Sequence, residues 1–119
     1  METTTYNNLK FNISKIAQNV SLLIEISAAK TITQEQREKI SLLYQSTIEL
    51  MYQTAAEFII IKGEAEKAAA LTENRINQKK AVQLTNESLK ELNYFLGLNI
   101  PSKFLIMEST NIGKPLTKK

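Results

Sequence analysis

The sequence predicts an all-α protein, and three observations support this fold class. The first hundred residues contain no proline, and only Gly63 and Gly97 interrupt them, which is typical of helical chains. Apolar residues recur at spacings of three and four, the period of an amphipathic helix, and the strand–helix alternation of a parallel sheet is absent. At 119 residues the chain is long enough to bury a hydrophobic core. We therefore expect a single antiparallel bundle of three long or four shorter helices over residues 1–109, followed by a flexible basic tail over residues 110–119.

The first two helices are predicted from their apolar stripes and from one capping signal. Residues 6–29 form the first helix, because large apolar side chains line one face of it. Thr33 and Gln36 have the spacing of a capping box, in which each side chain binds the backbone amide of the other residue. A second helix therefore begins near Gln34 and continues to about Lys62. The stripe of the first helix consists of Leu9, Ile13, Ile16, Val20 and Leu23.

The apolar run of residues 58–61 raises the question of a nucleotide-binding strand and loop. The run continues a helical pattern that is already more than five turns long, and no strand boundary precedes it. A lone Gly63 follows, without the further glycines and the lysine of a phosphate loop. The run therefore belongs to the second helix, and Gly63 is interpreted as a bend or helix junction.

The chain beyond Gly63 is predicted to be helical again. Residues 64–96 form either one helix or two, with Thr85 as a possible cap of the second. Gly97 is a candidate C-cap, and Pro101 can open a short helix across residues 102–108.

Composition argues against catalysis. There is no histidine and no cysteine, which removes the commonest general base, the commonest metal ligand and any thiolate site. The carboxylate pairs, such as Glu35 with Glu38, stand in polar stretches beside basic or amide side chains. We expect no catalytic residue, no metal and no cofactor. The N-terminus lacks a basic stretch followed by an apolar one, and no apolar run approaches membrane-spanning length, so a cytoplasmic location is expected.

Charge is concentrated in the second half of the chain. Residues 1–61 hold five basic and six acidic side chains, whereas residues 62–119 hold ten and six. Such a balance indicates either a surface for an anionic partner or simply solvated helix faces. If residues 64–96 are helical, Arg75 and Lys79 share a face and Lys80 lies beside them, a row that can follow phosphates. The expected nucleic-acid contacts are Arg75, Lys79, Lys80 and the tail residues Lys114, Lys118 and Lys119.

Aromatic residues near this row have two interpretations. Tyr94 and Phe95 can stack on bases if they are exposed. The neighbouring Leu92 and Leu96 favour a place in the core instead.

The apolar runs also predict self-association. At 100° per residue, four consecutive large apolar residues point almost all the way round a helix, so a small monomer leaves part of them exposed and available to a partner. The alternative is a central helix with neighbours on every side. The expected interface residues are Phe58, Ile59, Ile60, Ile61, Leu22 and Ile26.

Two segments resemble a known family. Residues 51–73, "MYQTAAEFIIIKGEAEKAAALTE", and residues 88–105, "SLKELNYFLGLNIPSKFL", resemble the four-helix-bundle accessory variability proteins of diversity-generating retroelements and the proteins encoded in 23S rRNA intervening sequences. The resemblance implies a homo-oligomeric, basic, non-enzymatic factor that binds RNA and protein. Residues 12–20, "NISKIAQNV", are similar to a segment of plasmid mobilisation accessory proteins, which also belong to mobile elements.

These expectations favour a non-catalytic, nucleic-acid-associated accessory protein of a mobile element, RNA-binding in particular, acting as a homo-oligomer. The alternative is a protein-only interaction module, such as a phage or plasmid regulator, that docks on a protein partner through exposed apolar helix faces. Salt separates the two, because phosphate binding weakens steeply with salt and apolar docking does not. The expected partners are thus nucleic acid or a protein of the same assembly, and no membrane.

Overall fold

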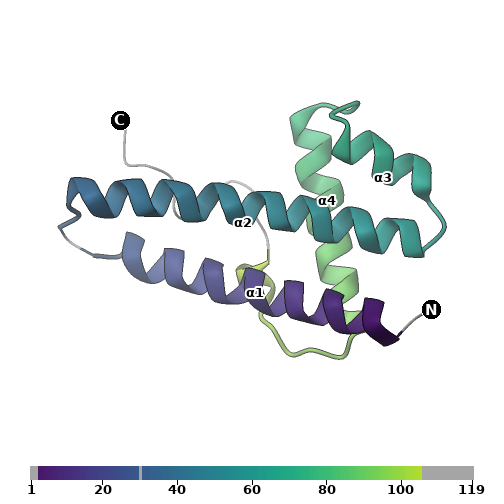
Figure 1. The fold of residues 1–119 in the computed structure, drawn as a ribbon, viewed down its shortest axis with the longest axis horizontal. Coiled ribbons are helices and arrows are strands. Elements are labelled where there is room, and N and C mark those ends of the chain that lie inside the picture. The colour runs from purple at the N-terminus through teal and green to yellow at the C-terminus, as the bar shows by residue number, and fades with distance from the viewer. Residues whose placement is uncertain (1–2, 30, 106–119) are drawn as a thin grey trace.

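The computed structural model describes residues 3–29 and 31–105, and this part of the chain contains helices and no strand. The all-α prediction is confirmed, with four helices packed against one another (Figure 1). The predicted tail of residues 110–119, including its three lysines, lies outside the described residues. The elements are α1 (Thr3–Ser27), α2 (Gln34–Ile61), α3 (Ala65–Thr72), α4 (Gln78–Phe95) and the short 3-10 helix η1 (Ser102–Phe104).

The helix α2 is the centre of the arrangement. It lies antiparallel beside α1, and α3 folds back along the C-terminal part of α2 (Figure 1). The helix α4 packs against the same part of α2 but crosses it steeply instead of running along it. After α4, residues 96–101 lead to η1, which contacts α1. One end of the α1–α2 hairpin therefore extends beyond the helices α3 and α4.

Local backbone chemistry sets the ends of α2. The predicted capping box is present, because the amide of Gln36 donates to Thr33 Oγ1 at 3.1 Å and the amide of Thr33 donates to Gln36 Oε1 at 2.8 Å. At the other end, Gly63 has a φ of +85°. Its amide donates to the carbonyl of Ile60, and the next amide, of Glu64, donates to the carbonyl of Ile59 at 3.1 Å. This is a Schellman motif, which glycine favours because it has no Cβ to oppose a left-handed backbone.

A break at residues 73–77 divides the segment that the sequence left open as one helix or two. Asn74 has a φ of +56°, and the amide of Arg75 donates to the carbonyl of Ala70 at 2.9 Å, which closes α3. Asn77 then caps α4 by accepting from the amide of Lys80 at 2.8 Å. The suggestion that Thr85 caps a helix is wrong, since this residue is fully buried inside α4. Asparagine suits the end of α3 because it tolerates the left-handed conformation. It suits the start of α4 because its side chain caps a helix well.

The predictions for the following turn and short helix are largely confirmed. Gly97 ends α4 with a φ of +70°. Its amide donates to the carbonyl of Tyr94, and the amide of Leu98 donates to the carbonyl of Asn93, again a Schellman motif. The segment after Pro101 forms η1.

Most buried apolar side chains form one cluster, to which all four helices contribute. The side chains that α1 contributes to this cluster all lie on one face of the helix, as their spacing of three and four predicted. Leu23 and Ile40 are buried as well but lie outside this cluster, in the part of the hairpin away from α4. The core of α1 and α2 consists of Leu9, Ile13, Ile16, Val20, Met51, Ala55, Ala56, Phe58 and Ile59.

The apolar run at the end of α2 is mostly covered within the chain. Phe58 and Ile59 are buried, and Ile61 packs against the core cluster. Only Ile60 is open, with 55% of its surface exposed. Neighbouring elements pack on several sides of α2, so they bury Phe58 and Ile59 and partly bury Ile61, and the part of the run that the monomer leaves exposed is Ile60.

Candidate functional site

The predicted basic row does not lie on one helix. Arg75 stands in the connection between α3 and α4 instead of on a face shared with Lys79, so that part of the sequence interpretation is wrong. Its guanidinium is also paired: Nε lies 3.1 Å from Glu73 Oε1, and Nη2 lies 3.6 Å from Glu66 Oε1. A cation between two carboxylates adds little attraction for a phosphate.

The other two residues of the row open α4. Lys79 and Lys80 occupy its first turn, which contains no acidic residue. Lysines are unusual there, because the N-terminal end of a helix already carries a partial positive charge. The first turn of α4 therefore concentrates positive charge. Within this turn, the backbone amide of Lys80 donates to the side chain of Asn77.

A third lysine extends this charge along α4. Lys90 follows Lys79 by eleven residues, and Tyr94 follows Lys90 by four. At 100° per residue these spacings place all three side chains, together with Lys80, within an arc of about 100°. All four are exposed, and in the part of the chain that the structure describes none of the three lysines forms an ion pair. We call Lys79, Lys80, Lys90 and Tyr94 the α4 face.

Sequence reasoning missed Lys90, although a signal for it was present. The spacing of eleven and four is meaningful only if the helix is continuous from Lys79 to Tyr94. Asn77, a good N-cap residue, could have located the start of that helix.

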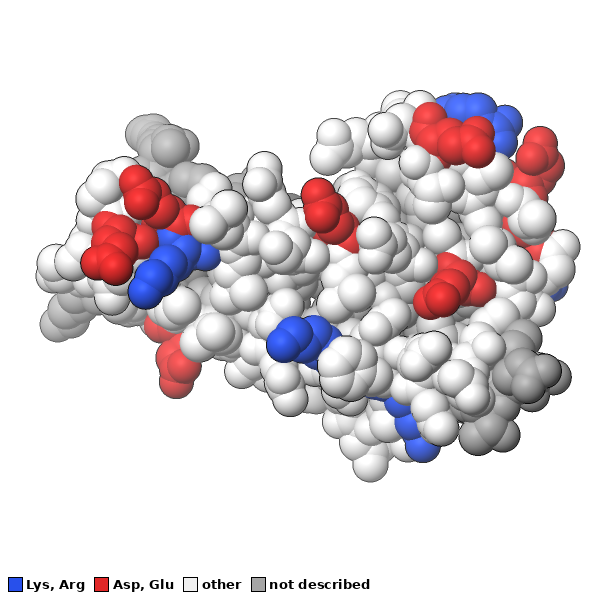
Figure 2. All heavy atoms as spheres, viewed as in Figure 1, with Lys and Arg blue, Asp and Glu red and all other residues white. Residues whose placement is uncertain are grey.

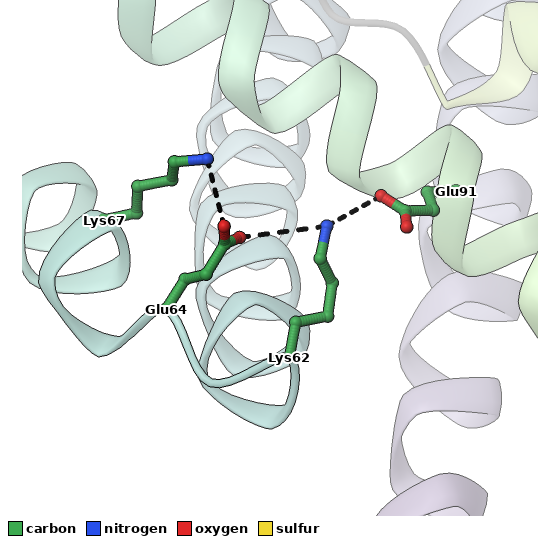
Figure 3. Close-up of polar contacts among 4 residues, drawn as sticks. All are labelled: Lys62, Glu64, Lys67 and Glu91. Atoms are coloured by element: carbon green, nitrogen blue, oxygen red, sulfur yellow. Dashed lines mark hydrogen bonds and ion pairs between the residues drawn. The ribbon is translucent and has the colours of Figure 1, made fainter.

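Two carboxylates accompany the α4 face, and they differ in their partners. Glu91 is engaged, because its Oε1 lies 2.8 Å from Lys62 Nζ (Figure 3). Lys62 also approaches Glu64, which in turn pairs with Lys67 at 3.3 Å. This chain of exposed contacts links the end of α2 to α3 and α4, and it leaves the lysines of the α4 face without a carboxylate partner.

Glu87 is the carboxylate that remains inside the arc of the α4 face. It accepts a hydrogen bond from Gln83 Nε2 at 3.3 Å, but the described residues give it no cation. Three lysines therefore stand against one uncompensated carboxylate, and the local charge is positive.

The aromatic residues at the end of α4 are exposed, so their predicted place in the core is wrong. Tyr94 is 87% exposed and Phe95 is 55% exposed. Phe95 still packs on its own chain, with ring centroids 5.6 Å from Tyr6 and 6.0 Å from Phe58. Tyr94, about 100° away round the helix, makes no ring or cation contact among the described residues.

Two hollows accompany the helices. A shallow groove of about 590 Å³ runs beside α1 and is closed on its other side by Ile100, Pro101 and Phe104. A smaller cleft of about 260 Å³ lies between α3 and α4, with Lys67 and Lys80 in its wall. Lys67 is paired with Glu64, and the wall also contains Lys80 and Glu87, so the cleft itself has no excess of unpaired positive charge.

The residues predicted for an oligomer interface are divided between core and surface. Phe58 and Ile59 are buried in their own chain, whereas Leu22 and Ile60 are exposed and Ile26 is half-buried. Other large apolar side chains that the sequence did not single out are more exposed, Phe11 at 68% and Leu42 at 66%. In Figure 2 the charged side chains of the face in view are scattered in small groups of mixed sign, with wide uncharged areas between them.

Residues 3–29 and 31–105 contain no group of three side chains that could hold a metal ion. No helix within these ranges is both long and apolar enough to cross a bilayer. Among the tyrosines, burial raises the pKa of Tyr44 and Tyr52, and the neighbouring charge of Tyr44 adds to the effect at Tyr52. Comparisons with protein families, with curated proteins and with solved structures find no match.

Proposed function

We propose that this chain is a non-catalytic accessory protein that binds nucleic acid through the α4 face. The observation that carries the proposal is the set of three exposed lysines on one arc of α4 with no ion-pair partner among the described residues. Ammonium groups attract the phosphate backbone and release its counterions, a contribution that does not depend on sequence. The predicted resemblance to RNA-binding accessory proteins points in the same direction.

The test is a binding titration at several salt concentrations. Replacing Lys79 and Lys90 together by Gln is expected to weaken binding to generic RNA and to lower the log–log salt slope by roughly 0.7–0.9 for each phosphate that a lysine no longer neutralises. Gln keeps helix propensity close to that of Lys, so the fold should persist. The matched control replaces Lys10 and Lys15, two exposed lysines of α1, by Gln. The proposal fails if both pairs change binding equally or if the wild type does not bind at low salt.

Two single variants sharpen this test. Arg75→Gln should weaken binding less than Lys79→Gln, because Arg75 is already paired with two carboxylates. Glu87→Gln should strengthen binding, since it removes the negative charge from the arc of the three lysines without changing the length of the side chain.

A second function, docking on protein, has its own supporting observation. Phe11, Leu42 and Ile60 each expose more than half of their surface, and exposed large apolar side chains can contribute to a partner interface where they lie together. If a face that includes Ile60 mediates self-association, Ile60→Lys should dissociate the oligomer, because an unpaired charge in a desolvated interface is costly. Sedimentation of the wild type as a monomer at micromolar concentration would rule out self-association, and salt-insensitive binding to a partner protein would favour this second function over the first.

A further inference from the structure

Tyr94 is the member of the α4 face that phosphate binding alone does not use. Its ring is 87% exposed on the same arc as Lys79 and Lys90, and one helical turn separates it from Lys90. A phenol ring adds no positive charge that would attract a phosphate. It does offer a flat apolar surface, and such surfaces stack on nucleobases.

The neighbouring ring shows what an aromatic side chain does here when it supports the fold. Phe95 keeps ring contacts with Tyr6 of α1 and Phe58 of α2, so it closes the edge of the core where three helices meet. Tyr94 has no such contact among the described residues. Its side chain therefore leaves both faces of the ring available.

We infer that the α4 face binds single-stranded rather than double-stranded nucleic acid, with the Tyr94 ring stacking on a base while the lysines contact neighbouring phosphates. This inference rests on the proposed function and adds the class of nucleic acid to it. In a duplex the bases are stacked on one another and paired, so a ring on a helix surface cannot reach their faces. In a single strand the bases can turn outwards and stack on aromatic side chains.

The geometry suits a short stretch of single strand. Lys79 and Tyr94 are fifteen residues apart, which is about 22 Å along an α-helix, and Lys90 lies between them close to the ring. A strand that follows α4 can therefore place one base on Tyr94 while its phosphates meet Lys90 and then Lys79. Because every base has a stacking face, this arrangement predicts little dependence on base sequence.

The experiment measures the affinity of the full chain by fluorescence anisotropy with three labelled probes of about 15 nucleotides. These are a single-stranded RNA, the single-stranded DNA of the same sequence, and the corresponding duplex. The variants are Tyr94→Ala and Tyr94→Phe, which keeps the ring. The matched control is Phe11→Ala, which removes a ring that is 68% exposed on α1. Circular dichroism checks that each variant is folded.

The expected result is tighter binding of the single strands than of the duplex. Tyr94→Ala should weaken single-strand binding about 5- to 150-fold, leave duplex binding unchanged, and leave the salt slope unchanged because no charge is removed. Tyr94→Phe and Phe11→Ala should bind as the wild type does. A preference for RNA over DNA, or the reverse, identifies the source of the strand and supports the inference equally.

Two results would overturn the inference and leave the proposed function standing. One is equal affinity for single strand and duplex, and the other is single-strand binding that Tyr94→Ala does not weaken. Failure of the wild type to bind any of the three probes at low salt would overturn both. Loss of binding to a partner protein in Tyr94→Ala, without nucleic-acid affinity, would assign the exposed ring to the docking function instead.

Discussion

Replacing Thr85 by Val should stabilise the protein. Thr85 is completely buried in α4, and its Oγ1 has no hydrogen-bond partner among the described residues. A buried hydroxyl without a partner costs roughly 1–3 kcal/mol of stability, because it gives up its hydrogen bonds to water and forms none in exchange. Val has nearly the same shape, the same branching at Cβ and a similar helix propensity, so the variant removes this cost and little else.

The expected gain in stability follows from the cost of the unpaired hydroxyl. Taking the lower end, we expect the free energy of unfolding to rise by about 1 kcal/mol. For a domain of this size that corresponds to a midpoint about 4 °C higher. Thermal melting followed by circular dichroism measures the midpoint, and urea titration gives the free energy independently.

Thr47→Val is the matched control. Thr47 is also buried, but its Oγ1 donates to the carbonyl of Leu43 at 2.7 Å. The same substitution there removes a hydrogen bond and should lower stability by about 0.5–1.5 kcal/mol. The reasoning is refuted if Thr85→Val lowers the midpoint as much as Thr47→Val does, since Thr85 would then have a hydrogen-bond partner in solution.

Three further predictions concern helix ends and tyrosines. Thr33→Ala should lower stability by about 0.5–2 kcal/mol, because an amide in the first turn of α2 loses its acceptor; an unchanged melting midpoint would contradict this. Gly63→Ala should lower the free energy of unfolding by about 1 kcal/mol, because alanine is strained at a φ of +85° although no atom lies within 4 Å of the new Cβ. Gly63→Asn should lower it less. Equal stability of the wild type and both variants would contradict the role of the left-handed turn. The raised pKa values of Tyr44 and Tyr52 mean that the folded protein holds these protons more tightly than the unfolded chain. The stability they contribute is therefore fully present below about pH 10 and is lost as the pH rises above it, so replacing both by Phe should make the fall in melting midpoint above pH 10 shallower than in the wild type.

Local signals in the sequence were sufficient for α1 and α2. The stripe of α1, the capping box at Thr33 and the glycine after α2 each involve residues close together in the chain, and the structure has all three. The possibility of two helices was left open, but the position of the break before α4 was missed because Glu73 and Arg75 are ordinary helix residues. Asn74 ends α3 through a left-handed backbone that composition does not reveal, whereas Asn77 caps α4 with its side chain and was the signal that could have located the break.

The errors in the candidate site follow from that missed break. Without a start at Gln78, the direction of each side chain on α4 could not be assigned, so Arg75 was placed with Lys79 and the ring of Tyr94 was placed in the core. Burial depends on which helices pack together, and a stripe shows only that one side of a helix is covered. For this reason the sequence could not show that Ile59 is buried while Ile60, its immediate neighbour, is exposed.

The central place of α2 has a consequence for how the chain folds. Its packing partners are α1, α3 and α4, and each joins it through a connection of only a few residues or through a short intervening helix. Chains dominated by contacts between neighbouring elements fold within microseconds to milliseconds, because little loop entropy is lost before each contact forms. The contact between Tyr6 and Phe95 joins α1 to the last turn of α4. It closes a much longer loop than the contacts of α2 with α1 or α3 do, so it should form after them.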